Sequence, residues 1–421
     1  MRTDETDGDV GGRSSTGTPR RAGSSIDSID GVTPGVVISP TTTDEVMSIV
    51  KDCRASALAI VPAGSATLLE IGNVPRRFDV RLDLLSLRQT IEHSPDDMVV
   101  TIAASVSLAG LNERLAETGQ RVALSAPDPQ HATVGGLAAT DFAGPLAYGF
   151  GCPRDQILGM TVVDGCGRRL RVGGRVVKNV AGYDLPRLFS GSFGTLGVIT
   201  ELTLRTYPCP AKSRVLHVEY ADPEGLDAAR GALFASNLPL SAIDADITHR
   251  AGSYRWSLRL LVEGTEAEVS QQETRIEALC ASAVGAARRA RPDSEAVSVD
   301  APVVVRMVGR PADGIRLATD LLREAANHGL EGYTSVEAAG TRSRWFAHCV
   351  RPEDCARAVT LARRLASRYG ASAIVERVPS SVKRTIDVWG ERPEGFEIMR
   401  RLKARFDPDD ILAPGRFVGG I

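Results

Sequence analysis

The chain has 421 residues, more than one ordinary hydrophobic core needs, so two or three domains are expected. Its 43% hydrophobic and 24% charged residues are typical of a soluble globular protein, and its formal net charge of −2 gives no general attraction to nucleic acid or an anionic membrane. No apolar run approaches the roughly 18 residues of a membrane-spanning helix, so no integral membrane segment is expected.

The N-terminal residues are rich in Gly, Ser, Thr and Asp and nearly lack large apolar side chains, which predicts a disordered tail over residues 1–30. No apolar stretch follows the basic pair Arg20–Arg21, so a secretory signal is not expected. We therefore expect a cytoplasmic protein, held at the inner face of the membrane, if at all, through partner chains.

Order is expected from Gly35, with a short strand followed by a helix over residues 41–56 that Thr43 caps. The apolar run 57–64 predicts a buried strand leading into a loop, so this opening has a strand–helix–strand pattern. Two further strands are predicted over 77–87 and 98–108, and a helix over 108–119 that ends at a glycine.

Residues 127–174 read as mostly loop around a strand over 157–172, with a hairpin turn at 164–167. After residue 210, strands alternate with alanine-rich helices, which predicts an α+β second domain with helices on one face of an antiparallel sheet. The predicted domains are a tail over 1–30, a first domain over 31–210, a second over 211–375 and a C-terminal segment over 376–421.

Three glycine-bearing loops stand beside predicted strands. The first, Pro62-Ala63-Gly64-Ser65-Ala66-Thr67, offers backbone N–H and hydroxyl donors that suit a phosphate, although an ordinary tight turn is the simpler interpretation of this loop alone. The second is the stretch 132–139, and the third places glycines at 191, 194 and 197. Glycine permits close backbone approach, so one extended ligand explains the three loops better than three unrelated turns.

Other chemistries lack their motifs. The seven cysteines are scattered without a C-x-x-C pair, which argues against a disulfide framework, a zinc site or an iron–sulfur cluster held by this chain. The six histidines have no metal-ligand spacing, so no metal site is expected. Lys178 could contact an anionic ligand or lie solvated on the surface, and Tyr183 with Asp184 could form a site pair or a packed tyrosine beside a turn.

The stretch VVKNVAGYDLPRLFSGSFGTLGVITELTLRTYP at 176–208 resembles the signature of the PCMH-type FAD-binding domain of the vanillyl-alcohol oxidase superfamily. More closely, it is similar to the FAD-binding E-type subunit of bacterial glycolate oxidase, as are PDPQHATVGGLAA at 127–139, the hairpin region 151–174 and the C-terminus from residue 373. The resemblance covers roughly residues 35–421 and is weakest over 210–345. It implies an α+β, PCMH-type two-subdomain FAD-binding fold with an α+β cap domain and a C-terminal segment that returns to the FAD domain.

The resemblance also implies roles for individual residues in binding FAD. The first loop would wrap the pyrophosphate, the second would hold the ribityl and pyrophosphate region, and the stretch at 178–183 would approach the flavin ring. The implied contacts are Pro62, Ala63, Gly64, Ser65, Ala66 and Thr67; Thr133, Val134, Gly135, Gly136, Ala138, Ala139 and Thr140; Arg154 and Asp155 at the edge; Lys178, Asn179, Gly182 and Tyr183 at the ring; Val198 and Ile199 at the adenine side; and Gly415 and Arg416 in the returning C-terminus.

The sequence departs from the family pattern in the first loop, where relatives usually carry R-G-G-G-T/S. Alanine at positions 63 and 66 removes the freedom for positive φ that glycine supplies, which is expected to reduce FAD affinity. The histidine that some relatives bond covalently to FAD is absent, so noncovalent FAD is expected. The C-terminal N-P-G-R of many relatives is Ala413-Pro414-Gly415-Arg416, which removes one amide side chain.

The chain also lacks the H-x-G-D-G-N-x-H stretch of the catalytic glycolate oxidase subunit and related 2-hydroxyacid dehydrogenases. The leading hypothesis is therefore an FAD-binding oxidoreductase subunit of a glycolate (2-hydroxyacid) oxidase complex, with the catalytic flavin subunit and an iron–sulfur subunit on separate chains. A stand-alone FAD-dependent alcohol or hydroxyacid oxidase is the second hypothesis, with Tyr183 or His348 as candidate base. The third is a structural subunit that has weakened or lost FAD binding.

Overall fold

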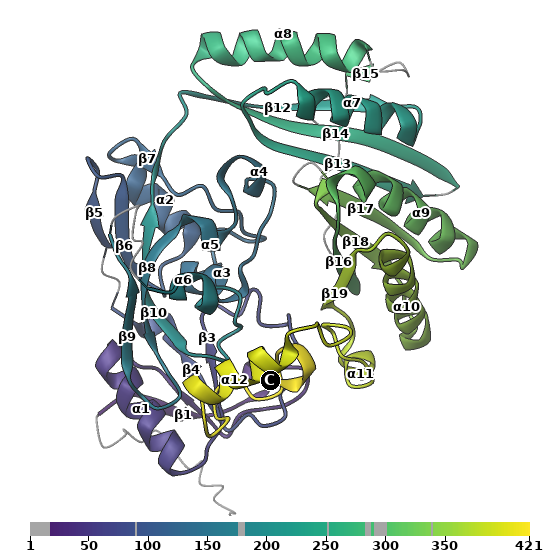
Figure 1. The fold of residues 1–421 in the computed structure, drawn as a ribbon. Helices are drawn as coiled ribbons and strands as arrows, with labels where there is room; N and C mark the ends of the chain where they lie inside the picture. Colours follow the sequence, from purple (N-terminus) through teal and green to yellow (C-terminus); the bar gives the residue numbers. More distant parts are fainter. Residues whose placement is uncertain are drawn as a thin grey trace, which may run out of the picture.

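A computed structural model describes residues 17–88, 91–175, 182–250, 252–282, 288–289, 301–337 and 340–421. Its two halves lie side by side, one built on two small sheets and the other on a large sheet, and the C-terminus returns to the first half (Figure 1). No helix in these described ranges is long and apolar enough to cross a membrane. The predicted flavin contacts Lys178 and Asn179 lie outside the described residues.

The first sheet has the strand order β1-β2-β4-β3, with β2 and β3 both parallel to the central β4. Helix α1 connects β2 to β3, as the strand–helix–strand pattern predicted. Its N-cap is Thr42, whose hydroxyl accepts a hydrogen bond from the backbone N–H of Glu45 at 3.2 Å, so the predicted cap at Thr43 was one residue late. The elements are β1 (Arg20–Ala22), β2 (Val36–Ile38), α1 (Thr43–Ala55), β3 (Ile60–Ala63) and β4 (Val80–Asp83).

The prediction of disorder up to residue 30 was wrong for residues 17–30. Strand β1 pairs antiparallel with β2. Asp27 is 1% exposed and accepts two hydrogen bonds from Arg21, and these bonds hold the pKa of its carboxyl well below the usual range. Charge pairing and strand pairing order this segment, whereas the prediction counted only apolar side chains.

The second sheet has the order β5-β6-β10-β8-β9, and β8 and β9 form the hairpin predicted around residues 164–167. Residues 127–156 were predicted as loop but contain three short helices. The first of them, α3, was missed because two glycines near its start hide the helical pattern. The elements are β5 (Ile91–Ser94), β6 (Val99–Ala103), α2 (Leu108–Ala116), β7 (Gln120–Arg121), α3 (Val134–Thr140), α4 (Ala147–Phe150), α5 (Pro153–Gln156), β8 (Ile157–Val163), β9 (Arg169–Gly173), α6 (Leu185–Phe189), β10 (Val198–Arg205) and β11 (Tyr207–Pro208), which pairs with β7.

The second half is an eight-stranded antiparallel sheet of order β15-β12-β14-β13-β17-β18-β16-β19, with helices α7 to α10 packed on one face (Figure 1). This is the α+β arrangement that the sequence predicted, although β13, α9, β17, β18 and β19 were not individually identified. The elements are β12 (Lys212–Tyr220), α7 (Pro223–Ala235), β13 (Leu240–Arg250), β14 (Ser253–Gly264), α8 (Glu266–Ser282), β15 (Arg288–Arg289), β16 (Val303–Val308), α9 (Gly314–Asn327), β17 (Glu331–Glu337), β18 (Arg342–His348), α10 (Pro352–Arg368) and β19 (Ser372–Arg377).

The C-terminal segment contains α11 (Ser380–Lys383) and α12 (Phe396–Phe406) and then pairs with the first sheet. The N–H of Ile60 donates to the carbonyl of Ile411, and the N–H of Ala413 donates to the carbonyl of Ile60, each at 2.7 Å. The segment after residue 411 therefore lies beside the loop that follows β3, as the resemblance implied.

Candidate functional site

A single cleft collects parts of all three glycine-bearing loops. It encloses about 780 Å³ of space, part of it open to solvent, between the loop after β3, the start of α3 and the turn before β10. Its lining includes Pro62, Ala63, Gly64, Ser65, Ala66, Thr67, Thr133, Gly135, Gly136, Ala139, Thr140, Ile199 and Arg416 from the predicted contacts.

The glycines bring the three loops into contact with one another. A Cβ on Gly64 would lie 2.5 Å from the Thr133 hydroxyl, and one on Gly194 would lie 2.9 Å from the Pro62 ring. A Cβ on Gly135 would lie 2.6 Å from the side chain of Ala104, so this missing side chain leaves room for α3 to pack on the turn that follows β6. Part of the glycine content therefore serves packing between loops rather than approach of a ligand.

The loop after β3 has the donors that an anionic ligand needs. The backbone N–H groups of Ser65, Ala66 and Thr67 have no hydrogen-bond partner among the described residues. Only one of the two alanines in the loop adopts a positive φ: Ala66 has φ of +64°, whereas Ala63 is an ordinary residue of β3. The expected loss of backbone freedom therefore applies to Ala66 alone.

Replacing Ala66 with glycine is expected to raise the free energy of unfolding by about 1 kcal/mol, because glycine adopts the left-handed conformation without the steric cost of a Cβ. The same change should tighten FAD binding, since the loop is then held with less strain. Chemical denaturation and flavin titration measure the two effects. The matched control Ala63→Gly should destabilise the buried strand instead, and equal effects of the two substitutions would contradict this assignment of strain.

Arg416 is a buried cation that lines the cleft. It is 2% exposed and donates hydrogen bonds to the carbonyl oxygens of Leu69 at 2.6 Å and Ile71 at 2.7 Å. Among the described residues it forms no ion pair with a carboxylate, and burial lowers its pKa to about 10. Gly415 has φ of +89°, and a Cβ there would lie 2.6 Å from Arg76, so this glycine turns the chain beside the arginine. An anionic group in the cleft would compensate the charge of Arg416.

Several predicted contacts lie away from the cleft. Val134 and Ala138 on α3, and Val198 on β10, are buried in the core. Arg154 forms an ion pair with Asp141, and Asp155 forms one with Arg187. Tyr183, next to Gly182, is 94% exposed, and His348 is exposed at the end of β18. The structure thus does not bring either candidate base, Tyr183 or His348, to the cleft.

The sequence reasoning missed the apolar wall of the cleft. Leu68, Leu69, Ile71 and Leu84 line it beside the glycine-bearing loops, as does Phe193. Phe193 has φ of +56° and its ring packs against Trp389 at a centroid distance of 4.8 Å. The L-L-x-I run directly after the first loop was the available signal, because such apolar residues next to a polar loop suit a ligand with a flat apolar part.

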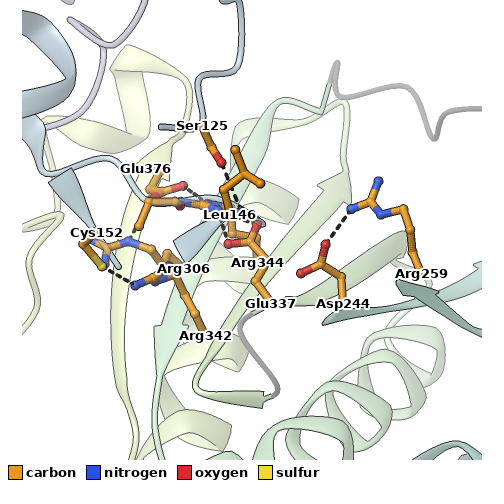
Figure 2. Close-up of polar contacts among 11 residues, drawn as sticks. Ser125, Leu146, Cys152, Asp244, Arg259, Arg306, Glu337, Arg342, Arg344 and Glu376 are labelled. Carbon is orange, nitrogen blue, oxygen red and sulfur yellow. Dashed lines mark hydrogen bonds and ion pairs between the residues drawn. The ribbon is translucent and has the colours of Figure 1, made fainter. Parts of the chain in front are cut away.

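The face of the eight-stranded sheet opposite its helices is charged and lies against the first half of the molecule (Figure 2). Arg344 is its centre, with hydrogen bonds to Glu337 at 2.5 Å and Glu376 at 2.8 Å. Arg344 also donates to the carbonyl of Ala143, just after α3, at 3.0 Å, and its guanidinium lies over the Phe142 ring. We call Asp244, Arg259, Arg306, Glu337, Arg342, Arg344 and Glu376 the polar face.

Asp244 is a fully buried carboxyl of this polar face whose pKa is raised. Its side chain has 0% exposure and pairs with Arg259 at 3.1 Å, and burial raises its pKa to about 7 despite that cation. A raised pKa in a buried carboxyl is typical of functional sites as well as of strained ion networks. Since the carboxylate is closed off from solvent, the structure gives no ground to assign Asp244 as the base.

Asp244 should make folding stability fall with rising pH. The folded protein retains a proton on this carboxyl between the unfolded pKa near 4 and the folded pKa of about 7, so its stabilising contribution is complete below the unfolded pKa and is lost as pH rises through the folded one. Asp244→Asn should remove this dependence. Between pH 4 and pH 8 the free energy of unfolding of the wild-type protein should therefore fall by roughly 2–4 kcal/mol relative to that of the variant. Urea denaturation at both pH values measures it, and parallel pH curves for both proteins would contradict it.

Two family models match the chain. Residues 34–173 match an FAD binding domain, and residues 389–417 match the C-terminal domain of FAD linked oxidases. Both matched segments contribute to the cleft, the first through its two loops and the second through Arg416. An apolar wall, backbone donors and a buried cation fit FAD, the cofactor that both family models name.

Curated relatives match mostly over part of the chain. A D-lactate dehydrogenase of Anaerostipes hadrus is 35% identical over 50% of this chain and 44% of its own length. The glycolate oxidase subunit GlcE of Escherichia coli K12 is 38% identical over 34% of this chain and 42% of its own. A D-lactate dehydrogenase of Archaeoglobus fulgidus is 26% identical over 91% of both chains. Two of these three matches therefore span less than half of the relative's length.

Among solved structures, p-cresol methylhydroxylase with substrate bound superimposes with a TM-score of 0.70 at 18% identity, covering 91% of this chain and 88% of the other. At that identity the likeness concerns the fold, which is the PCMH-type fold with mixed helices and sheets that the resemblance implied.

Proposed function

We propose that this chain, whose FAD-binding domain is of the PCMH type found in FAD-linked oxidases, is an oxidoreductase subunit of a glycolate (2-hydroxyacid) oxidase complex. In this proposal it passes electrons from the hydroxyacid through noncovalent FAD to a separate catalytic flavin subunit and an iron–sulfur subunit. The observation that carries it is the cleft. Ser65, Ala66 and Thr67, whose N–H groups have no partner among the described residues, line it together with the buried Arg416.

The chain's own residues define how FAD would be held. Ser65, Ala66 and Thr67 would donate to the pyrophosphate, and Arg416 would supply its positive charge. Leu69 and Phe193 would exclude water from the apolar part of the cofactor. When bound, FAD supplies the acceptor for the hydride that leaves the alcohol carbon of a hydroxyacid.

Two features support the role of a subunit. GlcE, to which this chain is similar, is named as a subunit of glycolate oxidase. The sequence contains no H-x-G-D-G-N-x-H stretch, and no group of three His, Cys, Asp or Glu among the described residues could hold a metal ion. In this proposal, the base and the onward electron carriers come from the partner chains.

A stand-alone FAD-dependent hydroxyacid dehydrogenase is the second candidate. It is favoured by the Archaeoglobus fulgidus relative, which is named D-lactate dehydrogenase and aligns with this chain over 91% of both lengths. Because the alignment covers 91% of this chain, it includes most of the eight-stranded sheet as well as the first half.

The visible spectrum of the purified chain, recorded before and after anaerobic addition of glycolate or D-lactate, tests these proposals. Bound flavin that bleaches only when the partner subunits are added supports the subunit role, and flavin that bleaches in the chain alone supports the stand-alone enzyme. A protein that stays colourless when FAD is added would overturn both, and would favour a structural subunit without FAD.

A further inference from the structure

We propose that Arg306 and Arg342, on the polar face of the eight-stranded sheet, form an anion subsite that binds the carboxylate of the substrate. The inference rests on the proposed function, which it deepens by assigning the group that recognises an acid rather than a neutral alcohol. It concerns the sheet half of the molecule, outside the cofactor cleft.

Strand register places both arginines on one face. Arg306 lies directly opposite Arg344, and Arg342 lies opposite Val308, so the three guanidinium groups belong to neighbouring positions of β16 and β18. The alternate residues of these strands, Met307 and Trp345, point into the core under the helices. The arginines therefore face the first half of the molecule, where Arg342 donates to the sulfur of Cys152 at 3.4 Å (Figure 2).

The arginines around Arg344 outnumber the carboxylates that pair with them. Glu337 accepts both of its short hydrogen bonds from Arg344, and Glu376 is shared between Arg344 and Arg306. Arg342 forms no ion pair with any described carboxylate. Three cations thus share two carboxylates, which leaves one positive charge without a compensating partner. Burial, together with the nearby cations of Arg344 and Arg342, lowers the pKa of Arg306, as expected where cations crowd.

The same two arginines have unused donors. Nη1 of Arg342 is buried and has no hydrogen-bond partner. The only polar contact of the Arg306 side chain is the ion pair of its Nε with Glu376 at 2.7 Å, so its two terminal amino groups have no partner among the described residues. Its side chain is 22% exposed, compared with 7% for Arg344, so Arg306 is the accessible member. A planar fork with free donors matches a carboxylate.

The subsite lies close to the cofactor cleft. Thr140 lines the cleft, and Ala143, whose carbonyl accepts from Arg344, is three residues further along the chain. Three residues span about 10 Å at most, so the polar face begins within that distance of the cleft wall. A small acid held at Arg306 would lie on the face of the sheet that is turned toward the half of the molecule that holds the cleft.

Calorimetric titration of the FAD-saturated protein with oxalate tests the inference without requiring turnover. Arg306→Met and Arg342→Met should each weaken oxalate binding by about 10- to 100-fold, because each removes a charged donor. Arg306→Lys keeps the charge but loses the fork and should fall between these variants and the wild type. The neutral analogue glycolamide should bind weakly to all of them. Arg323→Met, an exposed arginine on the helical face, is the matched control and should leave binding unchanged.

Thermal unfolding and flavin content check that each variant is folded and loaded. If the wild-type protein does not bind oxalate, or if the Arg306 and Arg342 variants bind it as the wild type does, the subsite is wrong. Flavin bleaching by hydroxyacids that persists unchanged in both variants would reject the subsite and leave the proposed function standing. The opposite result is oxalate binding that depends on the two arginines in a protein whose flavin no hydroxyacid bleaches, even with partners present. It would support the anion subsite and reject the proposed function.

Discussion

Arg416→Met is expected to abolish FAD retention and to lower the free energy of unfolding by about 2–4 kcal/mol. The guanidinium is buried and donates to two backbone carbonyls of the loop that lines the cleft, those of Leu69 and Ile71. Methionine fills similar space but leaves these carbonyls without donors and removes the positive charge beside the cleft. The ratio of flavin to protein after gel filtration gives the first effect, and urea denaturation gives the second.

A second variant separates loss of cofactor from loss of folding. Arg416→Lys keeps the charge but cannot reach both carbonyls, so it should retain part of the flavin at an intermediate stability. Arg400→Met, on the exposed side of α12, should behave as wild type in both measurements. Stoichiometric flavin in a folded Arg416→Met protein would show that the cofactor does not depend on this cation.

The lining of the cleft was largely predictable because its signals are local. The loop from Pro62 to Thr67 and the stretch from Thr133 to Thr140 each stand beside a strand, and several small-residue loops together favoured one extended ligand over unrelated turns. What these signals could not give is the direction of each missing side chain. Gly135 was identified as a site residue, but its absent Cβ faces Ala104, in the turn that follows β6.

The polar face was not predictable for the opposite reason. Arg344 reaches Glu337 and Glu376 on neighbouring strands, and Ala143 about 200 residues earlier in the chain. Nothing in the run RSRWFAH distinguishes a surface arginine from one that is buried at the junction of two halves. Partners that meet only through tertiary packing leave no spacing in the sequence.

Arg344→Met is expected to have the largest effect on stability, lowering the free energy of unfolding by about 3–5 kcal/mol. Glu337 and Glu376 are 6% and 9% exposed, so removing their shared cation leaves two buried carboxylates poorly compensated. The carbonyl of Ala143 also loses its donor, so the contact between the two halves is weakened. Urea denaturation at pH 7 measures the change, and Arg368→Met on exposed α10 provides the matched control.

The pH dependence of this variant identifies the cause. In the wild-type protein the arginines outweigh burial and hold the pKa of Glu376 below its usual value. Without Arg344, burial should raise the pKa of this carboxyl, so the variant should recover stability relative to wild type as pH falls and the carboxylates take up protons. Adding Glu337→Gln and Glu376→Gln to the variant should restore much of the loss at pH 7, because a neutral amide tolerates burial better than an unpaired carboxylate. If neither low pH nor the two glutamine substitutions reduce the loss of stability, Arg344 acts through its packing on Phe142 rather than through its charge.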